Sequence, residues 1–172
     1  MRDNGWELLP ACDKFNPHMN AKIHKILIHK YIDSEFTIWI DGSVEITKSI
    51  EKMTELFLKD HDIAVYNYRS WTREEKIETI EDQIAECCRL GKDDPKRIHE
   101  QYKNNSYPKR IPPICPIIFR RNNLQTARLN ERWWAEICRY SVRDQLSFPY
   151  VFTDYYEIGG NIKEDFLIKG HE

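Results

Sequence analysis

An acid follows an apolar run directly in FTIWIDGSVEI, residues 36–46. Residues 36–40 are aromatic or β-branched, which is typical of a buried strand and predicts a central position in the sheet. Asp41 and Gly42 end this run, and open α/β sheets bind ligands at the carboxyl edge of their strands. Asp41, with Ser43 close by, is therefore a candidate ligand of a divalent cation or of a sugar hydroxyl, because hard cations prefer oxygen ligands. Asp41 and Gly42 are equally well explained as an Asp-Gly pair that forms a turn.

A second polar cluster lies in RDQLSF, residues 143–148, directly after a helical pattern over 128–142. Arg143, Asp144 and Gln145 are either the polar end of that helix or functional groups. An aspartate at the C-terminal end of a helix is disfavoured by the helix macrodipole. Because of this cost, the functional interpretation has about the same weight as the interpretation that these residues simply end the helix.

One pair of basic side chains is a candidate for binding anions, and a second pair lies on one face of an expected helix. Arg120 and Arg121 end an apolar segment in FRRNN, where they are suited to phosphates or carboxylates, or form a solvated charge pair. Lys22 and Lys25 are three residues apart in an expected helix, so both lie on one face of it, beside the apolar stripe.

Helical and strand patterns alternate along the chain. Helices are expected over 17–31, 48–59, 73–90, 95–104 and 128–142, strands over 36–40, 63–68 and 114–121, and a short extended piece over 147–152. Thr72 and Glu75 form an expected capping box for the third helix. The proline within 114–121 predicts a strand that starts late or lies at a sheet edge. The alternation favours an α/β fold, and the length suits one domain over residues 1–172.

Composition excludes several classes of function. A net charge of −2 gives no field that would recruit nucleic acid, and no apolar run approaches the roughly 20 residues of a membrane span. The N-terminal residues lack the apolar segment of a signal peptide, so a cytoplasmic location is expected. The five cysteines include no C-x-x-C pair and are expected to be buried free thiols. No G-x-G-x-x-G, P-loop, G-x-S-x-G or H-E-x-x-H motif occurs.

Three blocks together carry a resemblance to a known family. They are AKIHKILIHKYIDSEFTIWIDGSVEI (21–46), LGKDDPKRIHEQYKNNSYP (90–108) and NERWWAEICRYSVRDQLSFPYV (130–151). The combination of W-I-D-G, W-W-x-E-I and R-D-Q-L-S-F resembles the glycosyltransferase-like family of the plant mucilage-related and turgor-defect proteins. That family is similar to GT-A glycosyltransferases, α/β enzymes that move a sugar from a nucleotide-diphosphate donor to an acceptor, usually with Mn²⁺ or Mg²⁺.

The resemblance implies a role for each candidate residue. It places Asp41 and Ser43 at the two positions of the metal-binding D-x-D pattern and His171 as the residue that completes the metal site. Lys22 and Lys25 are implied to touch the nucleotide, and Arg120 and Arg121, with Lys25, to offset the charge of the diphosphate. Asp144 and Gln145, next to Arg143, are implied to lie near the donor sugar and the acceptor, with Asp144 orienting the acceptor or acting as base.

The chain also departs from the family pattern. Relatives are expected to carry a first strand ahead of residue 1, so a mixed sheet flanked by helices and lacking that N-terminal strand is expected here. Asn122 stands where relatives often have histidine, and Asn67-Tyr68 stands where they often have His-Pro. A glycosyltransferase is therefore the main hypothesis, with a catalytically silent glycan- or partner-binding module as the alternative. The oligomeric state is left open.

Overall fold

The computed structural model describes residue 10 and residues 13–71 and 77–168. Its helices are α1 (Pro17–Ile26), the 3₁₀ helix η1 (Ile28–Lys30), α2 (Ile50–Phe57), α3 (Tyr68–Trp71), α4 (Ile80–Arg89), α5 (Pro95–Asn104), α6 (Leu124–Arg139), α7 (Asp144–Val151) and α8 (Ile162–Asp165). Its strands are β1 (Phe36–Ile40), β2 (Val44–Ile46), β3 (Ile63–Asn67), β4 (Pro113–Arg121), β5 (Tyr156–Ile158) and β6 (Phe166–Ile168).

Four strands form a mixed sheet in the order β1-β4-β3-β5, and β2 pairs with β6 in a separate ribbon. Strand β4 is antiparallel to both β1 and β3, while β3 is parallel to β5. Strands β1, β3 and β5 therefore run in the same direction, and their carboxyl ends meet at one edge of the sheet. The fold is α/β with a mixed sheet flanked by helices, as the sequence predicts.

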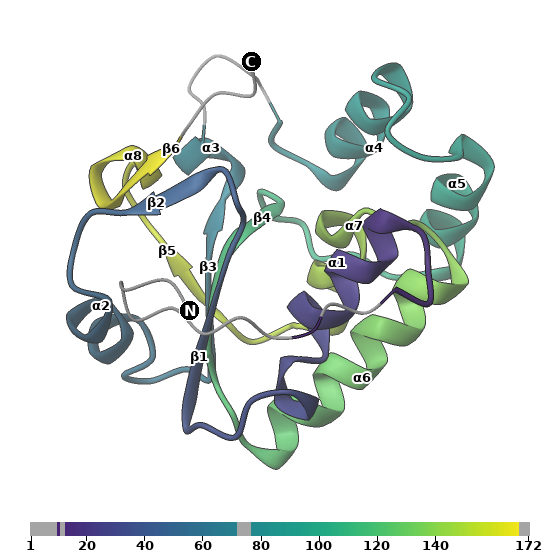
Figure 1. The fold of residues 1–172 in the computed structure, drawn as a ribbon. Helices are drawn as coiled ribbons and strands as arrows, with labels where there is room; N and C mark the ends of the chain where they lie inside the picture. Colours follow the sequence, from purple (N-terminus) through teal and green to yellow (C-terminus); the bar gives the residue numbers. More distant parts are fainter. Residues whose placement is uncertain (1–9, 11–12, 72–76, 169–172) are drawn as a thin grey trace.

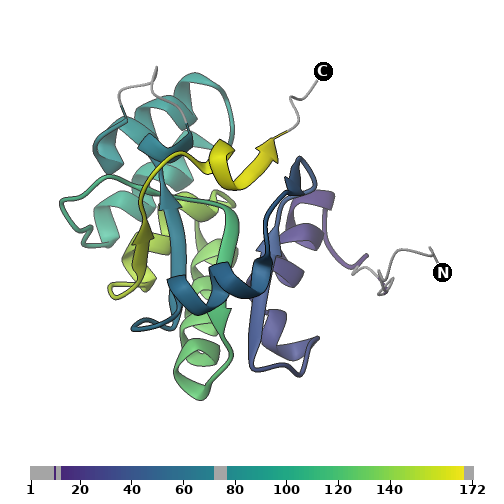
Figure 2. The same ribbon diagram turned by 90° about the vertical axis from the view of Figure 1, so that its left-hand side faces the viewer.

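Helices cover both faces of the sheet (Figure 1). Helices α1, α6 and α7 pack on one face over a core centred on the fully buried Trp133, which contacts Phe148 and Phe152 edge to face. Helix α2 covers the other face, where Phe57 packs against Phe119, and Figure 2 shows this helix crossing in front of the strands. Helices α4 and α5 join α7 through a third, smaller apolar cluster.

Strand β4 lies inside the sheet, so the prediction of an edge position was wrong. The strand accommodates Pro116 at an irregularity, because the pairing with β3 jumps from Val65 opposite Ile118 to Tyr66 opposite Ile114. A residue in such a bulge is left out of the hydrogen-bond ladder, so it does not need the N–H group that proline lacks. The Pro116 carbonyl still accepts from the Asp41 N–H at 2.8 Å, which ties the end of β1 to this point.

The end of α1 and the start of α4 also differ from the predictions. Helix α1 ends at Ile26 rather than continuing to residue 31, and η1 follows it. Helix α4 begins at Ile80, where Thr79 and Asp82 form a capping box. The predicted box of Thr72 and Glu75 lies outside the described residues. Gly91 ends the helix with a φ of 58°, a conformation that suits glycine.

The C-terminal third contains the largest change of secondary structure. Helix α6 starts at Leu124, four residues before the predicted start, because Asn123 caps it by accepting from the Thr126 N–H. Residues 147–152 were expected to be extended, but most of them belong to α7, which contains Pro149.

Among the described residues, no helix has the length and apolar character needed to cross a membrane.

Candidate functional site

A cleft of about 390 Å³ opens where β1 and β3 end and β4 begins. It is lined by Lys22, Lys25, Asp41, Ser43, Tyr68, Lys92, Ile114, Cys115, Pro116, Arg143, Asp144 and Gln145. The cleft therefore joins three of the polar clusters singled out in the sequence, although more than 100 residues separate the first of them from the last. Lys92 and Cys115 are cleft residues that the sequence did not point to.

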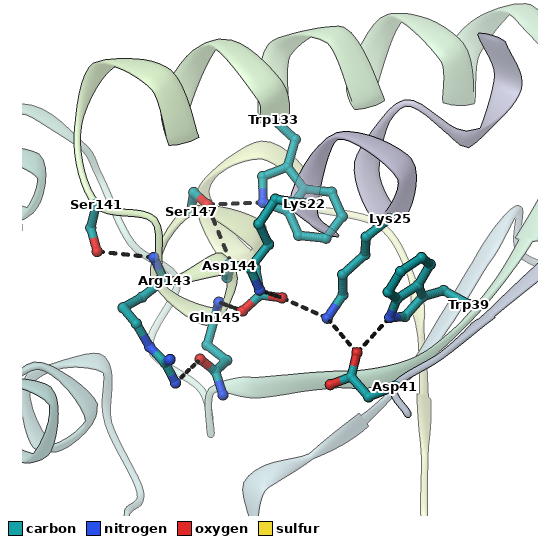
Figure 3. Close-up of polar contacts among 10 residues, drawn as sticks. All are labelled: Lys22, Lys25, Trp39, Asp41, Trp133, Ser141, Arg143, Asp144, Gln145 and Ser147. Carbon is teal, nitrogen blue, oxygen red and sulfur yellow. Dashed lines mark hydrogen bonds and ion pairs between the residues drawn. The ribbon is translucent and has the colours of Figure 1, made fainter. Parts of the chain in front are cut away.

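Helix α1 supplies the two lysines of the cleft. Asn16 caps the helix by accepting from the Met19 N–H, and Pro17 occupies its first turn. Because Lys22 and Lys25 are three residues apart, they lie on the same face, as predicted. Each places its Nζ atom 2.6 Å from the same oxygen, Asp144 Oδ2 (Figure 3). Lys25 is only 3% exposed, so this is a buried ion pair.

Asp144 begins a helix rather than ending one. The preceding helix stops at Arg139, and Asp144 is the first residue of α7 with Arg143 as its N-cap. At this end the macrodipole favours a negative charge, which reverses the electrostatic argument made from the sequence. The sequence argument placed Asp144 at the end of the helix predicted over 128–142, but that helix ends at Arg139 and a new one begins at Asp144.

A network behind the cleft fixes the turn that leads into α7. Asp93 accepts through Oδ2 from the Ser141 hydroxyl at 2.8 Å and from the Val142 N–H at 2.7 Å. The Ser141 Oγ accepts in turn from the Arg143 N–H at 3.1 Å, and the Arg143 guanidinium donates to Gln145 Oε1 at 3.1 Å. This positioning role of Asp93 was missed, because nothing in the sequence connects it with a turn almost 50 residues later.

Electrostatic coupling keeps the buried pair charged. Burial lowers the pKa of Lys25, but the attraction of Asp144, with smaller contributions from other neighbours that include Asp41, outweighs burial and raises it above the ordinary value. Burial raises the pKa of Asp144, but Lys22 and Lys25 outweigh it and hold that pKa far below the ordinary value. Burial also raises the pKa of Cys115, which keeps this thiol neutral. Asp144 therefore stays ionised at neutral pH and is a weak base.

Asp41 is the more open carboxylate of the cleft. Its side chain is 40% exposed, and its Oδ1 atom accepts from Trp39 Nε1 at 2.5 Å and lies 3.4 Å from Lys25 Nζ. Figure 3 shows the second carboxylate oxygen directed away from both donors. Asp41 lies in the cleft at the end of its strand, as expected. That strand, β1, is however the outer strand of the four-stranded sheet and not a central one.

The predicted phosphate-binding arginines do not line the cleft. Arg120 is fully buried, donates to the Lys25 carbonyl at 2.7 Å and lies beside Trp133, and burial lowers its pKa to about 10. Arg121 points to the opposite face of the sheet, where it pairs with Asp62 at 3.3 Å and lines a separate groove of about 680 Å³. Consecutive strand residues point to opposite faces, so the two cannot act together on one ligand.

Trp133 and Trp134 are neighbours on α6 but differ in burial and in the residues that they contact. Trp133 is fully buried and donates from Nε1 to the Ser147 hydroxyl at 2.8 Å, which links α6 to α7. Trp134 is partly buried and contacts Phe15 edge to face, rather than lining the cleft.

Cys138, expected in the core, is exposed. The four described cysteines are free thiols, as predicted.

The described residues do not fit a resident Mn²⁺ or Mg²⁺ ion. Asp41 and Ser43 line the cleft, but His171, the third expected metal ligand, lies outside the described residues. Within the part of the chain that the structure describes, no three His, Cys, Asp or Glu side chains gather as metal ligands do. Both carboxylates of the cleft already face the ammonium group of Lys25. Mg²⁺ is commonly held by one or two carboxylates together with substrate phosphates, but here Lys25 already engages Asp41 Oδ1 and Asp144 Oδ2.

Comparison with known proteins assigns the greater part of the chain to one family. The family model described as "TOD1/MUCI70, glycosyltransferase-like domain" matches residues 12–163. No curated protein and no solved structure matches the chain. All the residues that line the cleft fall within the matched range.

Proposed function

The chain belongs to the TOD1/MUCI70 glycosyltransferase-like family, and from this premise we propose that its cleft transfers a sugar from a nucleotide-diphosphate donor to an acceptor hydroxyl. The observation that supports this proposal is the meeting of Lys22, Lys25, Asp41 and Asp144 in one cleft at the carboxyl edge of the sheet. This edge is where α/β folds bind ligands. The cleft offers both cations for a diphosphate and a carboxylate for a hydroxyl group.

The proposed reaction breaks the bond between the anomeric carbon of the sugar and the diphosphate oxygen. The bonding electron pair stays on that oxygen, so negative charge develops on the leaving diphosphate. Lys22 and Lys25 stabilise this charge, because ammonium groups fixed in a partly buried site need no reorganisation during the reaction. The anomeric carbon then bonds to the acceptor oxygen, and the acceptor proton passes to a carboxylate.

Asp41 is the residue we assign to the acceptor hydroxyl. The family resemblance implied this role for Asp144, but its low pKa makes it a weak base, and its Oδ2 atom already binds two lysines. Asp41 is more exposed and keeps one oxygen directed away from its two donors. A base needs hydrogen-bond reach to the attacking hydroxyl, which an exposed carboxylate in the cleft can provide. Asp144 instead holds the lysines in position.

A donor screen tests this proposal. The protein is incubated with uridine and guanosine diphosphate sugars, with and without oligosaccharide acceptors, and release of the nucleoside diphosphate is measured. We expect turnover with at least one donor and a fall in kcat of about 10²–10⁴-fold in Asp41→Asn. Asp33→Asn, which changes an exposed aspartate outside the cleft, is the matched control.

One result would contradict the role of Asp41, and another would contradict the transfer reaction itself. Full activity of Asp41→Asn would remove Asp41 from the reaction. Binding of glycans by the protein, together with no turnover of any donor, would instead favour the silent glycan-binding module.

A further inference from the structure

We infer that the cleft binds the diphosphate of its donor through its own cationic side chains and without a divalent metal ion. The inference rests on the proposed function and specifies how the donor is held. The residues of the cleft disagree with the metal site that the resemblance implies. The charges, the ion pairs and the unused donors of the cleft all point to the same conclusion.

The charge of the cleft matches that of a nucleotide sugar. Among its described lining residues, four side chains are cationic, and Asp41 and Asp144 are anionic. The cationic side chains are Lys22, Lys25, Lys92 and Arg143. Cys115 stays neutral, because burial raises its pKa. Two positive charges therefore remain, and a diphosphate esterified at both ends carries one negative charge on each phosphate. No additional cation is needed for neutrality.

The carboxylates of the cleft are already bound to ammonium groups. Lys25 Nζ lies 2.6 Å from Asp144 Oδ2 and 3.4 Å from Asp41 Oδ1, between the two acids (Figure 3). A metal ion bridging these acids would replace Lys25 or approach its charge closely. Like charges that meet in a buried site repel each other strongly. Lys25 is 3% exposed and is held by the end of α1, so it cannot simply swing into solvent.

The cationic groups keep hydrogen-bond donors available for a ligand. An ammonium group has three N–H donors; Lys22 uses one on Asp144, and Lys25 uses one on Asp144 and a longer one on Asp41, so both keep at least one. The buried Arg143 Nε atom has no hydrogen-bond partner among the described residues. A buried donor without a partner costs free energy, which a phosphate oxygen would recover. Asp144 thus holds two lysines ready for the phosphates, so little freedom is lost on binding.

Titration calorimetry of the intact protein tests the inference. Uridine diphosphate, guanosine diphosphate and inorganic pyrophosphate are titrated in excess chelator, and again with Mn²⁺ or Mg²⁺. We expect at least one nucleoside diphosphate to bind in chelator, with its Kd nearly unchanged by the metal. Lys22→Gln should weaken that binding by about 10–100-fold, as expected for loss of a charge-assisted hydrogen bond.

Control variants keep the test decisive. Lys30→Gln changes an exposed lysine that pairs with Glu131 outside the cleft, and it should bind as the wild type does. Arg143→Gln provides a second cleft variant if Lys22→Gln does not fold, as judged by its thermal unfolding. Binding in chelator that survives both cleft variants would overturn the inference.

The remaining outcomes separate this inference from the proposed function. Binding that requires Mn²⁺ or Mg²⁺ would overturn the metal-free inference and leave the proposed glycosyl transfer intact. No binding of any nucleoside diphosphate under either condition would overturn both.

Discussion

Two pairs of basic residues in this protein have the same total charge and different positions. Lys22 and Lys25 lie three residues apart on helix α1, and both reach one oxygen of Asp144 in the cleft. Arg120 and Arg121 are neighbours on strand β4, and they point to opposite faces of the sheet. A helix brings residues three apart together, whereas a strand separates consecutive residues. Spacing therefore decides which pair forms a binding site.

The ion pair that Lys25 forms with Asp144 is buried more deeply than the ion pair that Arg121 forms with Asp62. The side chains of Lys25 and Asp144 are 3% and 5% exposed, whereas those of Arg121 and Asp62 are 33% and 39% exposed. A buried charge that loses its partner has no water to replace it, but an exposed one does. The ion pair in the cleft should therefore matter far more for stability than the ion pair on β4.

The largest expected effect is that of Asp144→Ala. It leaves Lys25 buried with only Asp41 nearby, and removal of one partner of a buried ion pair costs about 3–5 kcal/mol. Asp62→Ala, the matched change beside Arg121, should cost about 1 kcal/mol or less. Urea unfolding of both variants at pH 7 measures the two free energies. Equal losses would mean that burial does not distinguish the pairs.

A double variant separates a lost partner from a lost side chain. Asp144→Leu combined with Lys25→Met replaces the two most deeply buried charges of the cleft with apolar groups, and the remaining Lys22 side chain is 19% exposed and has access to water. Such replacements are often neutral or stabilising, so the double variant should recover most of the stability lost in Asp144→Ala. A double variant as unstable as Asp144→Ala would indicate that packing, and not charge, causes the loss.

The stability conferred by Asp144 should depend on pH in a defined direction. Its folded pKa is far below the ordinary value of about 3.9, so its contribution is complete above that value and is lost as the pH falls toward the folded pKa. The difference in unfolding free energy between wild type and Asp144→Asn should be constant from about pH 6 to 8 and shrink below about pH 4. Urea unfolding across this range measures it, and a difference that grows in acid would contradict the assignment.

Much of this arrangement could be predicted from local patterns. The apolar run before Asp41 correctly predicted a strand with an acid in the cleft at its end. The spacing of Lys22 and Lys25 correctly predicted a shared face, because helical geometry fixes it. Alternating helices and strands gave the α/β class, which depends on periodicity alone.

Features that depend on tertiary contacts were beyond reach of local patterns. The position of Pro116 inside the sheet depends on an irregular pairing with β3, which its own sequence does not encode. The start of α7 at Asp144 depends on Asp93, which fixes the preceding turn from a distant loop. The inward direction of Arg120 depends on the Lys25 carbonyl that it meets at the end of α1. In each case the determining partner is remote in the sequence.

Arg120→Met tests whether this arginine acts by supporting the lysine helix. The guanidinium donates to the Lys25 carbonyl, so its loss leaves a buried acceptor without a partner at a cost of about 1–3 kcal/mol. Because Lys25 then loses part of its support, diphosphate affinity should fall a few-fold, less than in Lys22→Gln. Calorimetry and urea unfolding measure the two effects. Unchanged stability would show that the hydrogen bond contributes nothing.

Arg121→Gln should have the smallest effect of all. Its acidic partners Asp62 and Glu35 are partly or largely exposed, and pairs of this kind contribute about 1 kcal/mol or less. Its guanidinium also donates to the Leu58 carbonyl at 2.9 Å, a bond that the amide of glutamine is able to replace. Its side chain lines the groove beside α2 rather than the cleft, so the affinity for a nucleoside diphosphate should stay within about twofold of wild type, a difference of about 0.4 kcal/mol. Calorimetry with the diphosphate that binds best measures this. A tenfold loss would mean that the donor also reaches the face of Arg121, and Lys22 and Arg121 would then have to act on one ligand from opposite faces of the sheet.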